Sequence, residues 1–535
     1  MNADGVPTLA NLAKLSLPPP QPDHPALGNP KAYVKHRKKE ISNAIYAAVE
    51  SFAQPQMEKI LSLTDWNEKQ DAIDDLFEQV HEAVKKSDPK DDYLGMVLAS
   101  QPTFPKLVEQ ALEEFLRKVA VDEKFEFEKM TEGGDKKNSE DKNEDDASGS
   151  EPVPIFLDLM KVQGAKMDDG GVPELLRPLK PHPYDGTGRM IEEWELSANE
   201  KTRRIMGREC IREIAELLSR IEGEDSKEGA ARVYVKGRKG AGKSAALSAI
   251  VASARISGHI VLYLPDGDRL RKNGFYLEPN NHRKSLEGKL FDLPILSKEL
   301  CAQLVETHSG DFEGMQVSKD VLDKIMGEDE LKSFSKKIED VESASLSAVL
   351  KIGSENVDLA AACYGAAMDI LMTQTEKPFT IVIDQFNCFF DHGYYFHGEY
   401  EKDIEKSVPL HKITLFKPLM DAMGVERNDD GEIDIKEPVL MKRGGIVAGV
   451  TESHAVARKF TSGLTDAMTD AGVNVVDVPQ YSPLEVEHIL SHFEIIGIGR
   501  LRFDRGETVM NKQEVAYLRM VSGGWGQNLL DACVS

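Results

Sequence analysis

The chain is poor in cysteine and shows no arrangement of cysteines that binds a metal. Only five of its 535 residues are cysteine, they are scattered, and no two of them form a C-x-x-C pair. An odd and scattered set argues against both a disulfide framework and a structural zinc site. We therefore expect free, buried thiols in a reducing compartment; the five are Cys210, Cys301, Cys363, Cys388 and Cys533.

Long apolar segments are also missing. The sequence has no run of about 18 consecutive apolar residues, the length that a membrane-spanning helix needs. The sequence therefore predicts no membrane insertion. The first 30 residues contain no arginine, which makes them an unconvincing mitochondrial presequence.

Positive charge is scarce overall but gathered in one stretch. The formal net charge of −25 excludes a protein that coats nucleic acid over its whole surface, because phosphate neutralisation needs clustered lysine and arginine. Residues 31–40 read KAYVKHRKKE and could meet a phosphate backbone locally, although a solvated basic arm is the other interpretation. The candidates for such a contact are Lys35, Arg37, Lys38 and Lys39.

Composition and apolar spacing divide the chain into five segments. Apolar residues at helical spacing predict a helical extension, and a charged stretch with glycine, serine and no large apolar residue predicts a disordered acidic linker. The predicted segments are a Pro-rich and basic tail (1–40), a helical extension (41–120), the linker (121–155), a nucleotide-binding domain (156–480) and a helical C-terminal lid (481–535). The lid begins with a predicted cap, Ser482 at the N-cap, Pro483 after it and Glu485 two residues later.

The fourth segment has an α/β pattern. We expect helices at 205–221 and 243–255, and short apolar runs alternate with helical segments over the whole domain. This predicts a parallel sheet flanked by helices on both faces. The predicted strands are 232–235, 259–265, 379–384, 444–450 and 473–479.

The strongest motif is GRKGAGKS at residues 237–244, which matches the phosphate-binding loop pattern between a strand and a helix. Its glycines let backbone N–H groups surround phosphate oxygens, and the helix N-terminus adds a partial positive charge. Lys243 is expected to reach the β- and γ-phosphates, and the hydroxyl of Ser244 to bind Mg²⁺. The predicted nucleotide-binding residues here are Gly237, Arg238, Lys239, Gly240, Ala241, Gly242, Lys243, Ser244 and Ala245.

Two further strand ends complete the predicted site. Asp384 ends the run FTIVID and is expected to support Mg²⁺. Thr451 ends the run GGIVAGVT and is a candidate sensor of the γ-phosphate. Because the run 259–265 stands between the loop strand and the acid strand, the pattern indicates a P-loop NTPase fold of the additional-strand (AAA-like) type.

The residue after Asp384 argues against fast hydrolysis. Related ATPases carry a glutamate there, whereas this chain has Gln385, and an amide does not accept a proton at neutral pH. Gln385 could still orient a water molecule, so slow turnover stays open. At the C-terminus, Gln527 and Asn528 stand where such ATPases often carry an arginine.

The identity of the base stays open. The stretch NKQE at 511–514 only faintly resembles a guanine-reading motif, so GTP, GDP and ATP all fit the sequence. Residues 426–437 have part of the spacing of a calcium loop, but they begin with Glu426 and Pro438 follows at once. An acidic turn is the better interpretation of that stretch.

Several stretches together resemble the death-associated protein 3 family, the P-loop proteins of the mitochondrial small ribosomal subunit. The resemblance covers roughly residues 200–535 and rests on the runs VYVKGRKGAGKSAALSAI, HIVLYLPDGDRLRKNG, FDLPILSKELCAQL, FTIVIDQFN, GGIVAGVTES, VPQYSPLEVEHILSHF and RMVSGGWGQNLLDAC.

The resemblance implies a structural ribosomal protein of the mitochondrial matrix. It implies mitochondrial ribosomal proteins and small-subunit rRNA as partners, and a purine nucleotide with Mg²⁺ as cofactor. It assigns phosphate binding to 237–244 and metal support to Asp384. The alternative function is an active ATPase or GTPase switch in signalling, and a small-molecule kinase with the run RLRKNG in its lid is a weaker one.

Overall fold

The computed structural model describes two compact units of the chain. One unit contains residues 153–479 and 496–498, and the other contains 1–152, 480–495 and 499–535. The described residues are 45–46, 49–50, 52–57, 59–60, 72, 75–76, 79, 108, 111–112, 115–116, 155–162, 165–168, 171–180, 191–197, 202–219, 230–272, 276–280, 282, 290–312, 314–338, 340–397, 406–428, 432–452, 455–498 and 512–534.

A five-stranded sheet with the order β15-β3-β14-β9-β4 forms the centre of the larger unit, and every neighbouring pair in it is parallel. All five strands predicted from the sequence are present and belong to this sheet. They are β3 (Ala231–Lys236), β4 (Ile260–Leu264), β9 (Phe379–Ile383), β14 (Gly444–Gly449) and β15 (Asn474–Asp477).

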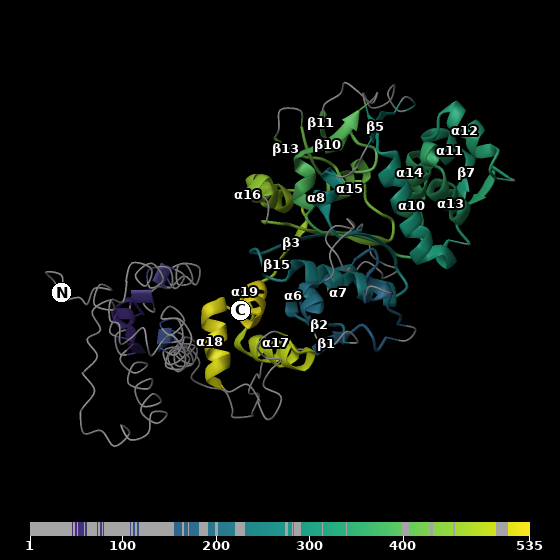
Figure 1. Ribbon diagram of the computed structural model, residues 1–535. Coiled ribbons are helices and arrows are strands. Elements are labelled where there is room, and N and C mark those ends of the chain that lie inside the picture. The colour runs from purple at the N-terminus through teal and green to yellow at the C-terminus, as the bar shows by residue number, and fades with distance from the viewer. Residues whose placement is uncertain are drawn as a thin grey trace, which may run out of the picture. The chain divides into compact units, whose positions relative to one another are not determined.

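The strands are apolar on both faces because helices cover both faces. Every residue of β4, β9 and β14 is buried, as parallel sheets require. Alternate side chains of a strand point to opposite faces, so Ile381 and Ile383 of β9 share one face of the sheet. They belong to the same core as residues of α15 (Lys417–Met423) and α16 (Ala455–Asp470). Figure 1 shows α6 (Glu209–Ser219) and α7 (Lys243–Ile256) on the other side of the strands.

The predicted helix at 205–221 is wrong at its start. Residues 204–207 form strand β2 (Arg204–Gly207), which pairs antiparallel with β1 (Ile155–Asp158), and the helix α6 begins only at Glu209. Local apolar spacing favours a helix, but pairing with a segment about fifty residues earlier in the chain, Ile155 with Gly207, decides the conformation.

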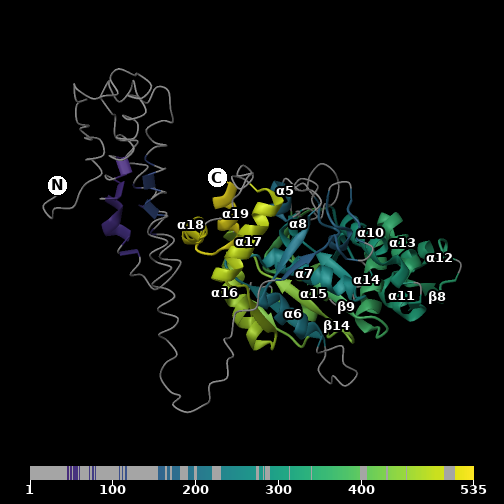
Figure 2. The same cartoon turned by 90° about the horizontal axis from the view of Figure 1, so that it is seen from below.

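A helical group that the strand pattern did not predict lies between β4 and β9. Within this group, α10 packs against α13 and α14, and α11 and α12 pack against α14. Side chains of the group belong to the same core as the sheet. Figure 1 and Figure 2 both show these helices gathered together. They are α10 (Pro294–His308), α11 (Lys319–Ile325), α12 (Glu328–Ser335), α13 (Leu346–Glu355) and α14 (Val357–Thr373).

Small sheets complete the larger unit. One has four strands in the order β11-β10-β5-β6, and three have two strands each, β1-β2, β7-β8 and β12-β13. Their bounds are β5 (Tyr276–Pro279), β6 (Phe291–Asp292), β7 (Gln316–Ser318), β8 (Ser343–Ser345), β10 (His392–His397), β11 (Lys406–Pro409), β12 (Val425–Arg427) and β13 (Ile433–Ile435). The stretch with calcium-loop spacing is therefore the hairpin of β12 and β13, and Glu426 pairs with Lys436 across it.

The smaller unit is helical where it is described. Every described position between 45 and 116 is helical, while the predicted tail (1–40) and nearly all of the predicted linker (121–155) lie outside the described residues. The predicted cap is confirmed at the start of α17 (Pro483–Ile496): Ser482 N–H donates to Glu485 at 2.8 Å, and Glu485 N–H donates to the Ser482 hydroxyl at 3.2 Å. Helices α18 (Lys512–Ser522) and α19 (Gly526–Val534) pack on each other.

In the part of the chain that the structure describes, no helix is both long enough and apolar enough to cross a bilayer.

A buried histidine supports the edge strand of the large sheet. His308, only 5% exposed, accepts the backbone N–H of Val261 on β4 at its Nε2 (3.0 Å), and its Nδ1 lies 3.0 Å from a carboxylate oxygen of Asp311. Burial lowers the pKa of His308, and the charge of Arg255 lowers it further, whereas Asp311 opposes the shift. The neutral imidazole is therefore the form that fits the fold.

This histidine predicts a loss of stability in mild acid. Below a pH of about 6.5 the unfolded chain binds a proton at His308 that the folded chain does not, so the free energy of unfolding falls as the pH falls through this value. A His308→Gln variant keeps a hydrogen-bond acceptor but does not titrate. Thermal unfolding between neutral pH and mildly acidic pH should fall more steeply for the wild type than for the variant; parallel curves would exclude the role given to His308.

Candidate functional site

The glycine-rich loop lies at the carboxyl end of β3 and continues into α7. Three of its glycines have positive φ angles, 147° at Gly237, 80° at Gly240 and 96° at Gly242, which L side chains rarely adopt. A Cβ atom at Gly237 would also lie 2.7 Å from the carbonyl oxygen of Val478. The chain therefore needs glycine here to turn its backbone from the strand into the helix.

Lys243 is held inside this loop. Its ammonium donates to the carbonyl oxygens of Gly237 at 2.6 Å and Arg238 at 2.8 Å, and the residue is 8% exposed. Burial lowers the pKa of Lys243, and the carboxylates of Glu452 and Asp384 oppose that shift. Three other residues predicted to bind the nucleotide lie in or just after this loop. Lys239 is exposed, and Ser244 and Ala245 lie in the first turn of α7.

Asp384 follows β9 at the same edge of the sheet. It is 4% exposed, its side chain is hydrogen-bonded to that of Ser244, and its Oδ1 accepts the N–H of Gln385 at 2.8 Å. Burial raises the pKa of Asp384 to about 6, against the lowering effects of Ser244, the Gln385 N–H and Lys243. The fold thus brings the two predicted metal-side residues together.

A hydroxyl beside a carboxylate is a hard oxygen donor set, which suits Mg²⁺. Among the described residues, no group of three or more His, Cys, Asp or Glu side chains could hold a metal ion by itself. Mg²⁺ commonly keeps several waters and binds through one or two protein oxygens together with phosphates. The residues of the loop and of β9 therefore fit the predicted metal.

Gln385 has a structural role beside this acid. Its φ of 61° is the only positive value among the described residues other than glycine. The turn aims its side chain at α8 (Gly267–Lys272), where its amide oxygen accepts the N–H of Asp268 at 3.2 Å. The side chain that replaces the expected glutamate therefore anchors a helix.

Thr451 lies at the end of β14, which separates β3 from β9 in the sheet. The fully buried side chain of Asn387 holds its backbone on both sides: Asn387 Oδ1 accepts the Thr451 N–H at 2.9 Å, and Asn387 Nδ2 donates to the Thr451 carbonyl at 2.7 Å. Sequence reasoning missed Asn387, although it stands in the run FTIVIDQFN.

This clamp predicts a large loss of stability on truncation. In an Asn387→Ala variant the buried N–H and C=O of Thr451 both lose their side-chain partner, which we expect to cost about 2–4 kcal/mol of unfolding free energy. Asn474→Ala is the matched control, because Asn474 is exposed and donates a single bond to a backbone carbonyl (3.3 Å). Chemical denaturation should separate the two variants; equal midpoints would contradict the clamp.

Two more residues at the loop were missed by sequence reasoning. Arg208, 8% exposed, donates to the carbonyl of Ala241 in the loop (3.1 Å) and to the carbonyl of Pro479 (2.8 Å). The carboxylate of Glu452 accepts the backbone N–H of Lys239 at 3.2 Å. Neither belongs to a recognisable local pattern, because each contact joins parts of the chain that are far apart in sequence.

The remaining predicted residues belong to other parts of the chain. Gln527 and Asn528 are in α19 of the smaller unit. Gln527 donates to Asp531, and Asn528 donates to the carbonyl of Ser522 at 3.4 Å. The basic stretch with Lys35, Arg37, Lys38 and Lys39 lies outside the described residues.

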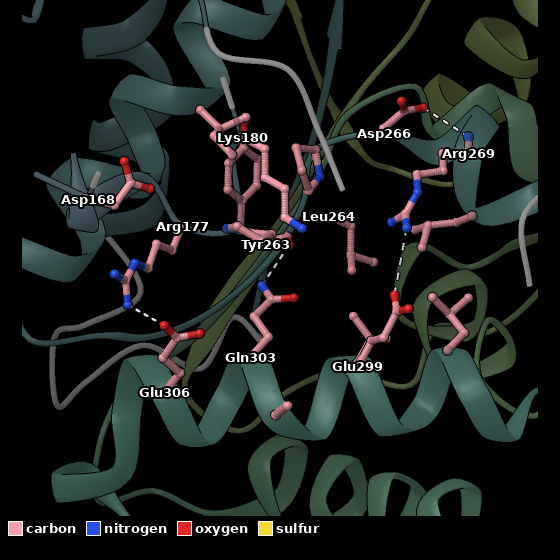
Figure 3. Close-up of a pocket in the computed structure, with 17 residues that line it drawn as sticks. Asp168, Arg177, Lys180, Tyr263, Leu264, Asp266, Arg269, Glu299, Gln303 and Glu306 are labelled. Carbon is pink, nitrogen blue, oxygen red and sulfur yellow. Dashed lines mark hydrogen bonds and ion pairs between the residues drawn. The ribbon is translucent and has the colours of Figure 1, made fainter. Parts of the chain in front are cut away.

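A separate cavity of about 480 Å³ opens at the carboxyl end of β4, with α10 along one side (Figure 3). None of the predicted nucleotide or metal residues lines it. Its arginines are paired, Arg177 with Glu306 and Arg269 with Glu299 (3.8 Å). An anionic ligand would have to break these pairs, so the glycine-rich loop is the better phosphate site.

Comparison with protein families identifies a match that covers the glycine-rich loop. The family model described as mitochondrial ribosomal death-associated protein 3 matches residues 210–513, which is more than half of the chain and includes the loop, Asp384 and Thr451. A search of curated proteins finds no match.

Proposed function

The chain belongs to the mitochondrial ribosomal death-associated protein 3 family, and from this premise we propose that it holds a purine nucleotide with Mg²⁺ as a component of the mitochondrial small ribosomal subunit. The family places the protein in the mitochondrion and among the ribosomal proteins of the small subunit. The proposal that the loop binds a nucleotide rests instead on the residues of this chain.

The observation that carries the proposal is the convergence of Lys243, Ser244 and Asp384 at one edge of the sheet. The loop N–H groups and Lys243 would bind the phosphates, and Ser244 and Asp384 would hold Mg²⁺, directly or through water. The metal, when bound, supplies positive charge that neutralises the phosphate oxygens. Arg208 supports the loop from behind through Ala241.

The strand order supports assignment to the additional-strand class. A strand stands between the loop strand β3 and the acid strand β9, as that class requires, and it is β14. The run 259–265, which stands between them in the sequence, forms β4 at the edge of the sheet. The proposed class therefore rests on the order of the strands in space and not on their order along the chain.

A retained ligand fits this site better than rapid turnover. Gln385 is engaged with α8 and has no basic group, so the position next to the metal-side acid contributes no general base. We propose that the nucleotide mainly stabilises the domain, since a ligand that binds only the folded state adds to its stability. A fast signalling switch is the competing function, and turnover on the order of 1 s⁻¹ or more would favour it.

The partners under this proposal are other mitochondrial ribosomal proteins. Small-subunit rRNA is a local partner of the basic stretch that contains Lys35, Arg37, Lys38 and Lys39. Sedimentation of mitochondrial extracts tests the placement: the chain should travel with the small ribosomal subunit and stay with it after high-salt washing. A chain that sediments alone, in the presence of intact small subunits, contradicts the proposal.

The metal side of the site gives a separate prediction. In an Asp384→Asn variant the carboxylate that would hold Mg²⁺ is lost, so the gain in nucleotide affinity on adding Mg²⁺ should largely disappear, while affinity without Mg²⁺ changes little. Titration calorimetry with and without Mg²⁺ measures the difference. An unchanged Mg²⁺ dependence would remove Asp384 from the metal site.

A further inference from the structure

Glu452 brings a carboxylate to the glycine-rich loop from a distant part of the sequence. Its Oε2 accepts the backbone N–H of Lys239, the third residue of the motif GRKGAGKS, at 3.2 Å. Glu452 is half-buried, and this solvent-accessible hydrogen bond places its carboxylate at the loop. A carboxylate beside backbone N–H groups that suit phosphate oxygens is unexpected, because both the carboxylate and the phosphate are negatively charged.

The sheet fixes the position of Glu452. Strand β14 is in register with both neighbours, Gly449 opposite Val235 of β3 and Ala448 opposite Ile383 of β9. The residues that follow β14 therefore emerge between the start of the loop and Asp384. Asn387 holds the preceding residue, Thr451, at both its N–H and its C=O.

The contact with the Lys239 N–H places the carboxylate of Glu452 beside the phosphate-binding loop. The lysine of a phosphate-binding loop reaches the β- and γ-phosphates. Lys239 lies in the same loop, four residues before Lys243, so a carboxylate that contacts the Lys239 N–H lies beside the groups that would bind the phosphates.

The other acidic groups near the loop make contacts that do not involve the backbone of the loop. Asp384 is hydrogen-bonded to Ser244 and would hold Mg²⁺. Asp266 accepts the N–H of Arg269 in the first turn of α8 at 2.9 Å. Gln385, at the position of the usual glutamate, is an amide bonded to α8. Glu452 is thus the group with the chemistry and the position of a base.

We propose that Glu452 is the general base of a slow hydrolysis of nucleoside triphosphate at this loop. The water oxygen forms a bond to the γ-phosphorus while the bond from that phosphorus to the β–γ bridging oxygen breaks. The bridging oxygen keeps the electron pair and leaves with the nucleoside diphosphate, and a carboxylate oxygen of Glu452 takes the water proton. The products are the diphosphate and inorganic phosphate. This inference rests on the proposed nucleotide binding and adds an activity to it.

The test compares the full-length wild type with Glu452→Gln, which removes the base but keeps a hydrogen-bond acceptor. Affinity for ATP and GTP with Mg²⁺, release of phosphate, and the nucleotide retained after gel filtration are measured. A general base contributes about 10²- to 10⁴-fold, so turnover should fall by about 100-fold or more. The variant should bind at least as tightly as the wild type and retain triphosphate where the wild type retains diphosphate.

Two further variants serve as controls for the comparison of the wild type with Glu452→Gln. Glu452→Asp retains a carboxylate and should recover part of the turnover, and Glu355→Gln, at an exposed position at the end of α13, should match the wild type. Equal turnover and the same retained nucleotide in wild type and Glu452→Gln, or no turnover in a wild type that binds triphosphate, overturns the inference and leaves nucleotide binding standing. Loss of binding in Glu452→Gln would show a purely structural carboxylate and also overturns it. A wild type that binds neither nucleotide overturns the proposed function as well.

Discussion

Replacing Lys243 by alanine should abolish retention of nucleotide while leaving the protein folded. The side chain supplies the buried cation of the loop, and it donates two hydrogen bonds to loop carbonyls, at 2.6 Å and 2.8 Å. On phosphate binding these donors can turn to phosphate oxygens, and hydrogen bonds to charged groups contribute about 1.5–3 kcal/mol each. We therefore expect a loss in affinity of about 100-fold or more.

The control for this variant is Lys351→Ala, at an exposed position of α13 that has no contact with the loop in the described part of the chain. Affinity is measured by titration with ATP and with GTP, and thermal unfolding without nucleotide checks that the fold survives. Nucleotide should raise the unfolding temperature of the wild type and of Lys351→Ala but not that of Lys243→Ala. Equal affinity in all three proteins would refute the role of Lys243.

Replacing Gly444 by alanine should prevent the central sheet from forming. Gly444 begins β14 with a φ of 113°, and a Cβ atom there would lie 2.0 Å from the carbonyl oxygen of Phe379 on β9. The Cβ is fixed directly to the Cα of β14 and the oxygen belongs to the backbone of β9, so neither can move without breaking the pairing of the two strands. We expect a loss of more than about 4 kcal/mol of unfolding free energy, at the extreme of single substitutions.

Gly463→Ala is the matched control for this prediction. Gly463 lies in α16 on an exposed position, and its nearest neighbour to an added Cβ is the Cδ1 of Ile433 at 3.8 Å, an ordinary contact. Alanine in a helix interior is favoured over glycine by about 0.5–1 kcal/mol, so this variant should be slightly more stable than the wild type. Chemical denaturation gives both values, and a Gly444→Ala protein as stable as the wild type contradicts the strand pairing.

The parts of the fold that the sequence predicted are those that local pattern determines. The five strands of the large sheet are continuous apolar runs because both faces are buried, and such runs are visible without knowing their partners. The loop is equally visible, since its glycines meet a local backbone requirement. The cap of α17 depends only on Ser482 and Glu485, three residues apart.

The parts that could not be predicted depend on distant segments. Residues 204–207 become a strand because β1 pairs with them, and the helical group from α10 to α14 is placed by a core that it shares with the sheet. The strand that separates β3 from β9 is β14, which only the order in space reveals. Asn387, Glu452 and Arg208 reach the site across long stretches of sequence, so no spacing rule identifies them.

The consequence for function is greatest at Gln385 and Glu452. From the sequence, the missing glutamate beside Asp384 favours a loop that holds its nucleotide and does not cleave it. The structure agrees with this argument, because the side chain of Gln385 is hydrogen-bonded to α8. It also supplies a second carboxylate at the loop, from the end of β14. Retention and slow cleavage are therefore compatible in one site.

The nucleotide content of the protein in its particle tests most directly whether the chain holds a purine nucleotide in the small ribosomal subunit. Mitochondrial small ribosomal subunits that contain the chain are purified without added nucleotide, denatured in acid, and the released nucleotides are identified by chromatography and mass spectrometry. We expect a stoichiometric purine nucleotide that disappears from particles carrying Lys243→Ala. Particles in which the wild-type chain is present in full amount and no nucleotide is released, or in which Lys243→Ala releases as much as the wild type, would contradict it.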